Sequence, residues 1–276
     1  MNKTPVQSGE SSLKPKARLI KTIGEDLISN NIVAVIELVK NSYDANSPIV
    51  VVEFKGIVEK VLEGKKEKRI LKKENASIII LDEGDGMDLD IIDKAWMEPA
   101  TNFKKKIENE NKKRRFTGEK GIGRFASAEL ACKLDIFTKR REDNEVVVNF
   151  NWDDFSDEEK YLDEVKTKWC VRSPEKIMNH GTILELNELN TIWDENNIRE
   201  LRVSLSRLLS PITPAEDFLI ELKLPEGLDD LSGLIERPET LNRPDYYIKG
   251  FISIEGKPTL KYYSKKEKQE ITINIT

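Results

Sequence analysis

Two residue types that build many small sites are scarce in this chain. Its 276 residues include two cysteines, Cys132 and Cys170, and one histidine, His180. Neither cysteine has a C-x-x-C partner or a cluster of histidines near it in the sequence. We therefore expect neither a disulfide framework nor a zinc site, and this cysteine usage is typical of a reducing compartment.

Long apolar runs and an excess of positive charge are missing as well. No eighteen apolar residues follow one another, and the first ten residues contain no apolar stretch such as a signal peptide needs. The net charge is −5, so the chain as a whole is not built to seek nucleic acid or an anionic membrane. We expect a cytoplasmic protein without a membrane span. The 38% of hydrophobic residues is enough for a core.

Prolines divide the chain into two parts. Five of them, at positions 211, 214, 225, 238 and 244, fall close together and predict an inter-domain connection. We expect a flexible polar segment at 1–14 and a main domain at 15–222. A linker and the beginning of a second, truncated β-rich domain would follow at 223–276. A terminal edge strand is the simpler alternative for the last apolar run.

The hydrophobic patterns predict an alternation of helices and strands. Helices are expected at 15–29, from Asn30 or Asn31 onward, at 91–97, from the glycines near 123 to about 131, and at 195–209. Strands are expected at 49–54, 77–81, 133–139, 145–151, 166–172, 181–187, 219–222, 246–254, 258–263 and 271–275. A charged hairpin or loop is expected at 59–74.

The second of these helices carries a polar stripe on an otherwise apolar surface. In Ile36-Glu37-Leu38-Val39-Lys40-Asn41-Ser42-Tyr43-Asp44-Ala45, Asn41 lies about 40° and Asp44 about 20° from Glu37 in helical projection. Apolar residues cover most of the remaining circumference, which indicates a buried helix. Burying an acid and an amide costs on the order of several kcal/mol unless they face a metal, water or a ligand. The stripe therefore predicts a pocket wall, although on its own it also fits an exposed polar pair.

Three other segments have the chemistry of a nucleotide site. Asp82-Glu83-Gly84-Asp85-Gly86 follows a predicted strand, so its first carboxylate can accept from an exocyclic amine while the glycines let a flat ring approach. The glycines at 118–123 precede a helix and can cradle an anion, with Lys120 adding a charge. Gly181-Thr182 opens a strand and places a small hydroxyl where it can support the aspartate.

Other motif interpretations fit less well. The segment 82–88 lacks the further oxygen ligands and the bidentate glutamate of a calcium loop. Residues 121–126 match G-x-G-x-x-A, but a basic loop rather than a strand precedes them, which disfavours a dinucleotide fingerprint. Gly118-Glu119-Lys120 does not fit a P-loop.

Taken in order, the four segments resemble the motifs of the GHKL ATPase superfamily, which includes gyrase, a heat-shock chaperone, histidine kinases and MutL. The similarity covers about residues 15–220, and the segment 120–125 is most similar to the MORC-like and chaperone-like branches and their bacterial relatives. The resemblance implies an α+β Bergerat fold, a two-layer α/β sandwich with a mixed sheet and helices on one face. ATP would lie between the helices and a lid at about 98–123.

The resemblance also implies roles for individual residues. Glu37 would be the general base, Asn41 the Mg²⁺ ligand, and Asp82 the acceptor for adenine N6, helped by Thr182 through water. The other positions implied at the nucleotide are Asp44, Ala45, Gly84, Gly86, Met87, Gly118, Lys120, Gly121, Ile122, Gly123, Arg124 and Phe125. ATPase relatives complete the phosphate site with a cation from the next domain. No motif selects among Lys249, Lys257 and Lys261, so we expect slow hydrolysis.

Three functions are compatible with these motifs. The first is an ATP-gated conformational switch that forms a homodimer through its N-terminal segment and lid. The second is the ATPase clamp of a topoisomerase-, MutL- or MORC-like protein, with DNA bound by the basic residues at 104–115. These residues have few interleaved aromatics, so a solvated lid is the competing interpretation. The third, a histidine-kinase catalytic domain, is disfavoured because residues 1–30 contain no histidine.

Overall fold

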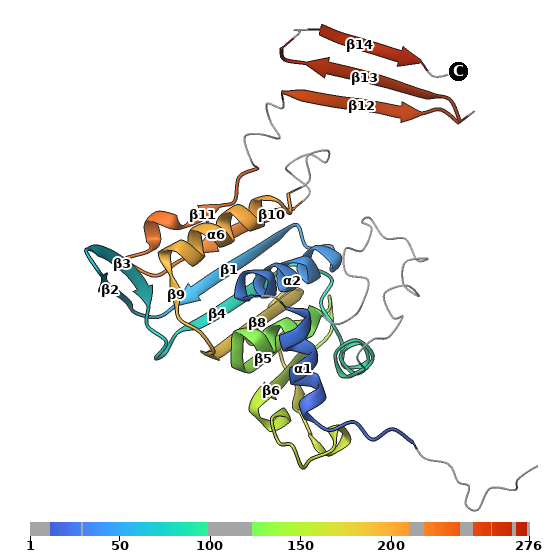
Figure 1. The fold of residues 1–276 in the computed structure, drawn as a ribbon. Helices are drawn as coiled ribbons and strands as arrows, with labels where there is room; N and C mark the ends of the chain where they lie inside the picture. The colour runs from blue at the N-terminus through green and yellow to red at the C-terminus, as the bar shows by residue number, and fades with distance from the viewer. Residues whose placement is uncertain are drawn as a thin grey trace, which may run out of the picture.

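The computed structural model describes residues 12–28, 30–98, 123–209, 218–237, 245–254, 256–266 and 269–274 (Figure 1). Its largest element is an eight-stranded sheet in the order β11-β10-β1-β4-β8-β5-β6-β7. These strands are β1 Ile49–Lys55, β4 Ser77–Asp82, β5 Ala131–Lys139, β6 Glu145–Asn151, β7 Lys168–Arg172, β8 Gly181–Leu189, β10 Leu219–Lys223 and β11 Gly233–Leu234. The sheet is mixed, because β1 pairs with β10 in parallel and every other pair is antiparallel.

Two smaller sheets accompany it. One contains β2 Val58–Glu63, β3 Lys66–Leu71 and the short β9 Trp193–Asp194, so the charged hairpin predicted at 59–74 is confirmed. The other is an antiparallel meander of β12 Tyr246–Ile252, β13 Pro258–Ser264 and β14 Gln269–Asn274. The strands predicted after residue 245 are therefore present.

Helices cover one face of the large sheet, as Figure 1 shows for α1 and α2. The α-helices are α1 Arg18–Leu27, α2 Asn31–Asp44, the single turn α3 Leu89–Ile91, α5 Ala126–Leu130 and α6 Glu195–Ser206. A π-helical turn, η1 Ile92–Met97, continues α3. The 3-10 turns are η2 Gly123–Phe125, η3 Trp152–Phe155, η4 Leu162–Glu164 and η5 Asp229–Leu231. Among the described residues no helix is both long and apolar enough to cross a bilayer.

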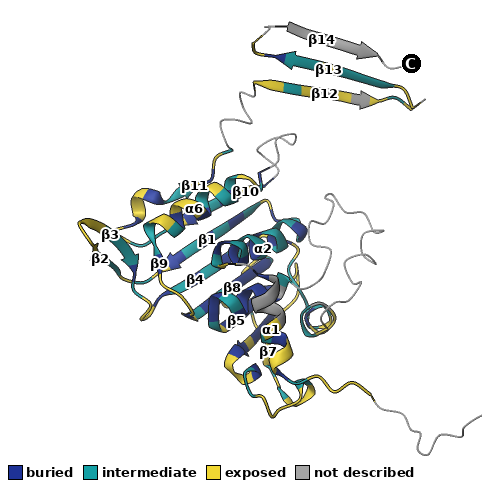
Figure 2. Cartoon of the chain, in the orientation of Figure 1, coloured by how far each residue is buried: buried dark blue, intermediate teal, exposed yellow. Residues whose placement is uncertain are grey.

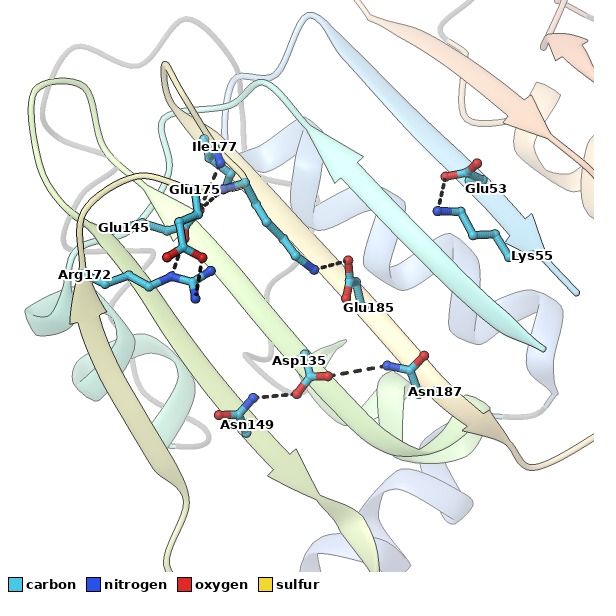
Figure 3. A network of polar contacts seen from close by, with 11 residues as sticks. Glu53, Lys55, Asp135, Glu145, Asn149, Arg172, Glu175, Ile177, Glu185 and Asn187 are labelled. Carbon is cyan, nitrogen blue, oxygen red and sulfur yellow. Dashed lines mark hydrogen bonds and ion pairs between the residues drawn. The ribbon is translucent and has the colours of Figure 1, made fainter. Parts of the chain in front are cut away.

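The main core lies between the large sheet and these helices (Figure 2). Alternate residues of β1 (Val50, Val52 and Phe54) are buried toward the helices, and Leu38 and Val39 of α2 meet that layer with no exposed surface. The opposite face carries ion pairs and polar contacts (Figure 3), together with a smaller apolar cluster of Phe137, Val147, Ile177 and Ile183. The helical layer packs on the other face over the main core, so the predicted α+β class with helices on one face is confirmed.

The sequence predicts the start of α2 better than the start of α1. Asn30, rather than Asn31, caps α2: its backbone is extended, and its side chain accepts from the Val33 amide at 2.9 Å. The first helix begins at Arg18 instead of residue 15. Helix α1 does not start earlier because Lys16 forms a β-bridge with Tyr161. The Ala17 amide also donates to the carbonyl oxygen of the neighbouring Lys160.

Replacing the cap of α2 should destabilise the fold without changing its core. For Asn30→Ala we expect a loss of about 0.5–2 kcal/mol in the free energy of unfolding, because the Val33 amide loses its acceptor. Asn30→Ser keeps a capping oxygen and should retain most of the stability. Urea denaturation followed by circular dichroism measures both. Equal stability of the alanine and serine variants would contradict the capping role.

Candidate functional site

The polar stripe of α2 lies at the edge of the core. Asp44 is 5% exposed, while Glu37 and Asn41 are half-buried. Glu37 Oε1 accepts from Lys40 Nζ at 2.6 Å, and its side chain retains 28% of its surface. The helix is thus less completely enclosed than its apolar pattern predicts, because the Glu37 side opens outward. That opening gives the stripe access to a ligand.

The start of η2 faces the same stripe. A Cβ built on Gly123 would lie 3.5 Å from Glu37 Oε2 and 3.8 Å from Asn41 Nδ2. The end of the predicted lid and the polar stripe therefore meet, although many residues separate them in the chain. Gly118, Lys120, Gly121 and Ile122 lie outside the described residues, as do most of the lid and the basic residues at 104–115. Their roles stay predictions.

The next two predicted positions lead from this turn into the core. The Arg124 side chain is not described. Phe125 is buried and packs edge-on against Trp152, with ring centroids 6.4 Å apart. The ring of Phe125 therefore anchors η2 to the core and fixes the turn that carries Gly123 beside the stripe.

A buried carboxylate marks the other side of the site. Asp82 ends β4 and is 8% exposed. Its Oδ2 accepts from Ser42 Oγ at 3.0 Å, and its Oδ1 accepts from the Gly84 amide at 2.9 Å. The β4–β8 register places Thr182 directly opposite, so the structure brings these two predicted residues together.

Burial dominates the titration of this carboxylate. Desolvation raises the pKa of Asp82 to about 6, although hydrogen bonds from Gly84, Ser42 and the Thr182 backbone oppose the shift. Asp85 adds a smaller effect in the same direction as burial. At pH 7 the carboxyl group of Asp82 is mainly ionised, so it can accept a hydrogen bond from a donor on a ligand.

Glycines allow three segments to approach one another at this end of the sheet. Gly86 has φ +68°, and a Cβ there would lie 1.9 Å from the Lys139 carbonyl oxygen. Gly181 has φ +132°, and its Cβ would lie 2.1 Å from the Asp82 carbonyl oxygen. A side chain is excluded at both positions by backbone atoms that cannot move away easily.

Gly84 is required because the loop after β4 packs closely against the end of α2. A Cβ at Gly84 would lie 2.6 Å from the Ala45 carbonyl oxygen, and the Asp85 amide donates to that same oxygen at 2.8 Å. The space that a side chain at Gly84 would need is therefore filled by the end of α2. Ala45 acts as the residue against which the loop after β4 packs.

Sequence patterns missed several hydroxyl groups that shape the site. Ser42 holds Asp82, and Ser47 accepts from the Glu83 amide at 2.9 Å. Thr138 of β5 accepts from the Met87 amide at 2.9 Å, which fixes the predicted Met87 at the end of the loop. Ser42 could have been found as a further polar group on an apolar helix. A hydroxyl within an apolar strand such as β5 gives no comparable signal.

His180 lies just before β8 and joins the surrounding loops. Its Nδ1 lies 2.7 Å from the Gly84 carbonyl oxygen and its Nε2 lies 3.1 Å from Arg141 Nη2. Because a carbonyl only accepts and a guanidinium only donates, the neutral ring carries its proton on Nδ1. His180 thus ties the start of β8 to the loop after β4.

The donor set near Glu37 fits magnesium held together with a phosphate compound. No group of three metal-binding side chains occurs among the described residues, so a cation bound by protein alone is not indicated there. Mg²⁺ is commonly held by one or two protein oxygens, with substrate phosphates and water supplying the rest. The amide oxygen of Asn41, next to Gly123, matches that requirement, and the carboxylate of Glu37 lies beside it.

The comparisons with known proteins agree with this geometry. Residues 28–182, more than half of the chain, match the family model described as "Histidine kinase-, DNA gyrase B-, and HSP90-like ATPase". A comparison with curated proteins finds no match. The family match does not distinguish among branches, so the likeness to MORC-like and chaperone-like members stays a prediction. With its mixed sheet, its helical layer and this match, the chain belongs to the histidine kinase-, DNA gyrase B- and HSP90-like ATPase family.

Proposed function

We propose that the chain is a Mg²⁺-dependent ATPase that acts as a conformational switch. The observation that carries the proposal is the meeting of four distant segments at one end of the sheet. The stripe of α2 lies against Gly123, while Asp82 of β4 lies opposite Thr182 of β8. The Asp82 carboxylate suits the amine of the adenine base. The polar stripe beside the Gly123 backbone suits the phosphates of the same nucleotide.

The adenine end of the proposed site is built around Asp82. Its carboxylate is fixed by Ser42 and Gly84, and it accepts a hydrogen bond from the exocyclic amine. Thr182, next to it across the strands, supplies a second polar contact directly or through water. Gly86 and Met87 carry the loop that borders the base, and Asp44 and Ala45 close the pocket from α2. Recognition here depends on groups that are already in place.

The phosphate end is built around Glu37 and Asn41. Mg²⁺ bound with the nucleotide would neutralise phosphate charge, and the Asn41 amide oxygen would be its protein ligand. Glu37 would take a proton from the attacking water. Its Oε2 faces Gly123, beside which the phosphates would lie, and its Oε1 accepts a hydrogen bond from Lys40. Gly118, Lys120, Gly121, Ile122, Gly123, Arg124 and Phe125 would contribute the backbone amides and the positive charge around the phosphates.

We expect ATP binding at this site to be coupled to larger motions, as in ATPase members of the family. ATP binding closes the lid at 98–123, and two copies associate through their N-terminal segments and lids. A lysine or arginine from a second domain completes the phosphate site, with Lys249, Lys257 and Lys261 as candidates within this chain. Because no motif selects among these lysines and the phosphate site needs such a cation, we expect this chain to hydrolyse ATP slowly, and hydrolysis would reset the switch.

A DNA-handling clamp is the second candidate, favoured by the basic residues at 104–115. Replacing residues 112–115 (Lys112, Lys113, Arg114 and Arg115) by glutamate should abolish DNA binding if they contact phosphates. The binding constant of the unchanged chain should also fall steeply with salt. Fluorescence anisotropy with a labelled duplex measures both. DNA that changes neither the ATPase rate nor dimerisation would exclude this function.

Substitutions should separate the two residues of the stripe. Glu37→Gln should lower turnover by about 10²-fold or more while sparing Mg·ATP binding, because a general base contributes in the transition state. Asn41→Ala should weaken Mg·ATP binding by roughly 10- to 150-fold, the range for losing a contact with a charged partner. Phosphate release and isothermal titration calorimetry measure these effects.

Removal of magnesium supplies the matched control for that pair. EDTA should weaken ATP binding by the unchanged chain and by Glu37→Gln, but it should add little to the defect of Asn41→Ala. Full turnover in Glu37→Gln would refute its role as the base. Equal sensitivity to EDTA in all three proteins would refute Asn41 as the metal ligand.

The affinity for ATP should fall in acid through Asp82. Burial raises the pKa of this carboxyl to about 6, so a proton competes with the adenine amine below that pH. The folded state binds this proton more tightly than the unfolded chain, so protonation of Asp82 does not itself unfold the protein. We expect the dissociation constant for ATP to increase as the pH falls below 6. Well below pH 6 it should increase by about tenfold for each pH unit.

Asp82→Asn is the control for this pH dependence. The asparagine variant should bind ATP more weakly at pH 7 and should lose the component that titrates near pH 6. Titration of the nucleotide phosphates affects both proteins equally and cancels in the ratio of their dissociation constants. An unchanged ratio between pH 5 and pH 7.5 would contradict the assignment.

A further inference from the structure

Three polar side chains form a row across the centre of the large sheet. The strand registers place Asp82 of β4 opposite Thr182 of β8, and Thr182 opposite Thr138 of β5. Their strands alternate in phase, so all three lie on the face covered by helices. The row continues into Val50 on one side and Val146 on the other. The proposed function uses Asp82 and Thr182, and it leaves Thr138 without a role.

Thr138 is completely buried and joins three segments of the site. Its Oγ1 accepts from the Met87 amide at 2.9 Å. The same oxygen lies 3.2 Å from the Gly181 carbonyl oxygen and 3.0 Å from Thr182 Oγ1. The single hydroxyl proton of Thr138 therefore has two possible acceptors, and both belong to the start of β8.

The position of that proton decides what Thr182 offers to a ligand. If Thr138 donates to the Gly181 carbonyl, Thr182 donates to Thr138 and presents only lone pairs elsewhere. If Thr138 donates to Thr182 Oγ1, the proton of Thr182 is available to an acceptor on the ligand. A side chain without a hydroxyl at 138 could not make the second arrangement.

An adenine ring requires the second arrangement. Its amine N6 donates, and the adjacent ring nitrogen N1 accepts. The Asp82 carboxylate satisfies N6, so Thr182, the next polar group in the row, meets N1 directly. Only a donating Thr182 completes that contact, because two acceptors facing each other would repel.

We propose that Thr138 is a positioning residue for base recognition, which orients the Thr182 hydroxyl as a donor toward the ring nitrogen beside the amine of adenine. This inference rests on the proposed function, because it names how the same site reads its nucleotide. Thr138 contacts no ligand itself and acts through Thr182. The preference for a purine with an acceptor at this ring position then depends on a side chain one strand away from the pocket.

The test compares ATP with 1-deaza-ATP, which has a carbon–hydrogen group in place of N1. Calorimetry with Mg²⁺ should show that the unchanged chain prefers ATP by roughly three- to tenfold, the range expected for one hydrogen bond. Thr138→Val keeps the shape of the side chain and removes its donor. In that variant Thr182 keeps its own proton, but no hydroxyl at 138 directs it toward the ligand, so we expect most of the preference to be lost. Thr138→Ser keeps the hydroxyl and should restore it.

Two further measurements distinguish positioning from a general loss of structure. Purine riboside triphosphate lacks the amine but keeps N1, so the preference for ATP over this analogue reports on Asp82 and should persist in Thr138→Val. Thr182→Val should lose the preference over 1-deaza-ATP, and the double variant should lose no more. If Thr138→Val does not fold, Thr138→Cys, with a much weaker donor, takes its place.

The outcomes separate this inference from the function on which it rests. An unchanged chain that binds no Mg·ATP would overturn both. An unchanged chain that binds ATP and 1-deaza-ATP equally would overturn the inference alone, and so would a folded Thr138→Val variant that keeps the preference. Loss of the preference in Thr138→Val, with rescue by serine and no further loss in the double variant, supports it.

Discussion

A carboxylate held out of water at the end of a central strand places requirements on every segment around it. Hydrogen bonds from Ser42 of α2, the Gly84 amide and the Thr182 backbone lower the pKa of Asp82 against the opposing effect of burial. Each donor comes from a different part of the chain, so the helix, the loop after β4 and the start of β8 must all reach one point. Removing any one of them leaves a buried charge with fewer partners, which is costly in a protein interior.

The helix α2 links that carboxylate to the polar stripe. Ser42 faces Asp82 while Glu37 and Asn41 face Gly123, so a single rigid helix spans the base end and the phosphate end of the proposed site. The spacing between the ends is therefore fixed by helical geometry and not by loops.

The sequence predicts most of the fold because its strands and helices have strong local signals. A cap at Asn30 or Asn31, seven of the eight strands of the large sheet and a charged hairpin or loop at 59–74 follow from apolar periodicity and turn chemistry, whereas the two-residue β11 gives no such signal. The start of α1 could not be predicted, because a pairing with Tyr161, distant in the sequence, prevents the helix from extending to residue 15. Within the site, the acids and glycines stand out from their neighbours. Thr138 does not, since a hydroxyl in an apolar strand gains its role only from the strand opposite it.

Glu145, on the face away from the helices, has a consequence for the connection that leads from β7 to β8. Burial alone would raise the pKa of Glu145, but hydrogen bonds from Arg172 and from the amides of Ile177 and Lys176 hold it below its usual value (Figure 3). The connection from β7 to β8 is thereby fastened by Glu145 near its middle and by His180 at its end. Its conformational entropy is lost when the protein folds and not when a nucleotide arrives. The end of the sheet where Asp82 and Thr182 lie is therefore bordered by a connection whose middle and end are both already fixed by hydrogen bonds.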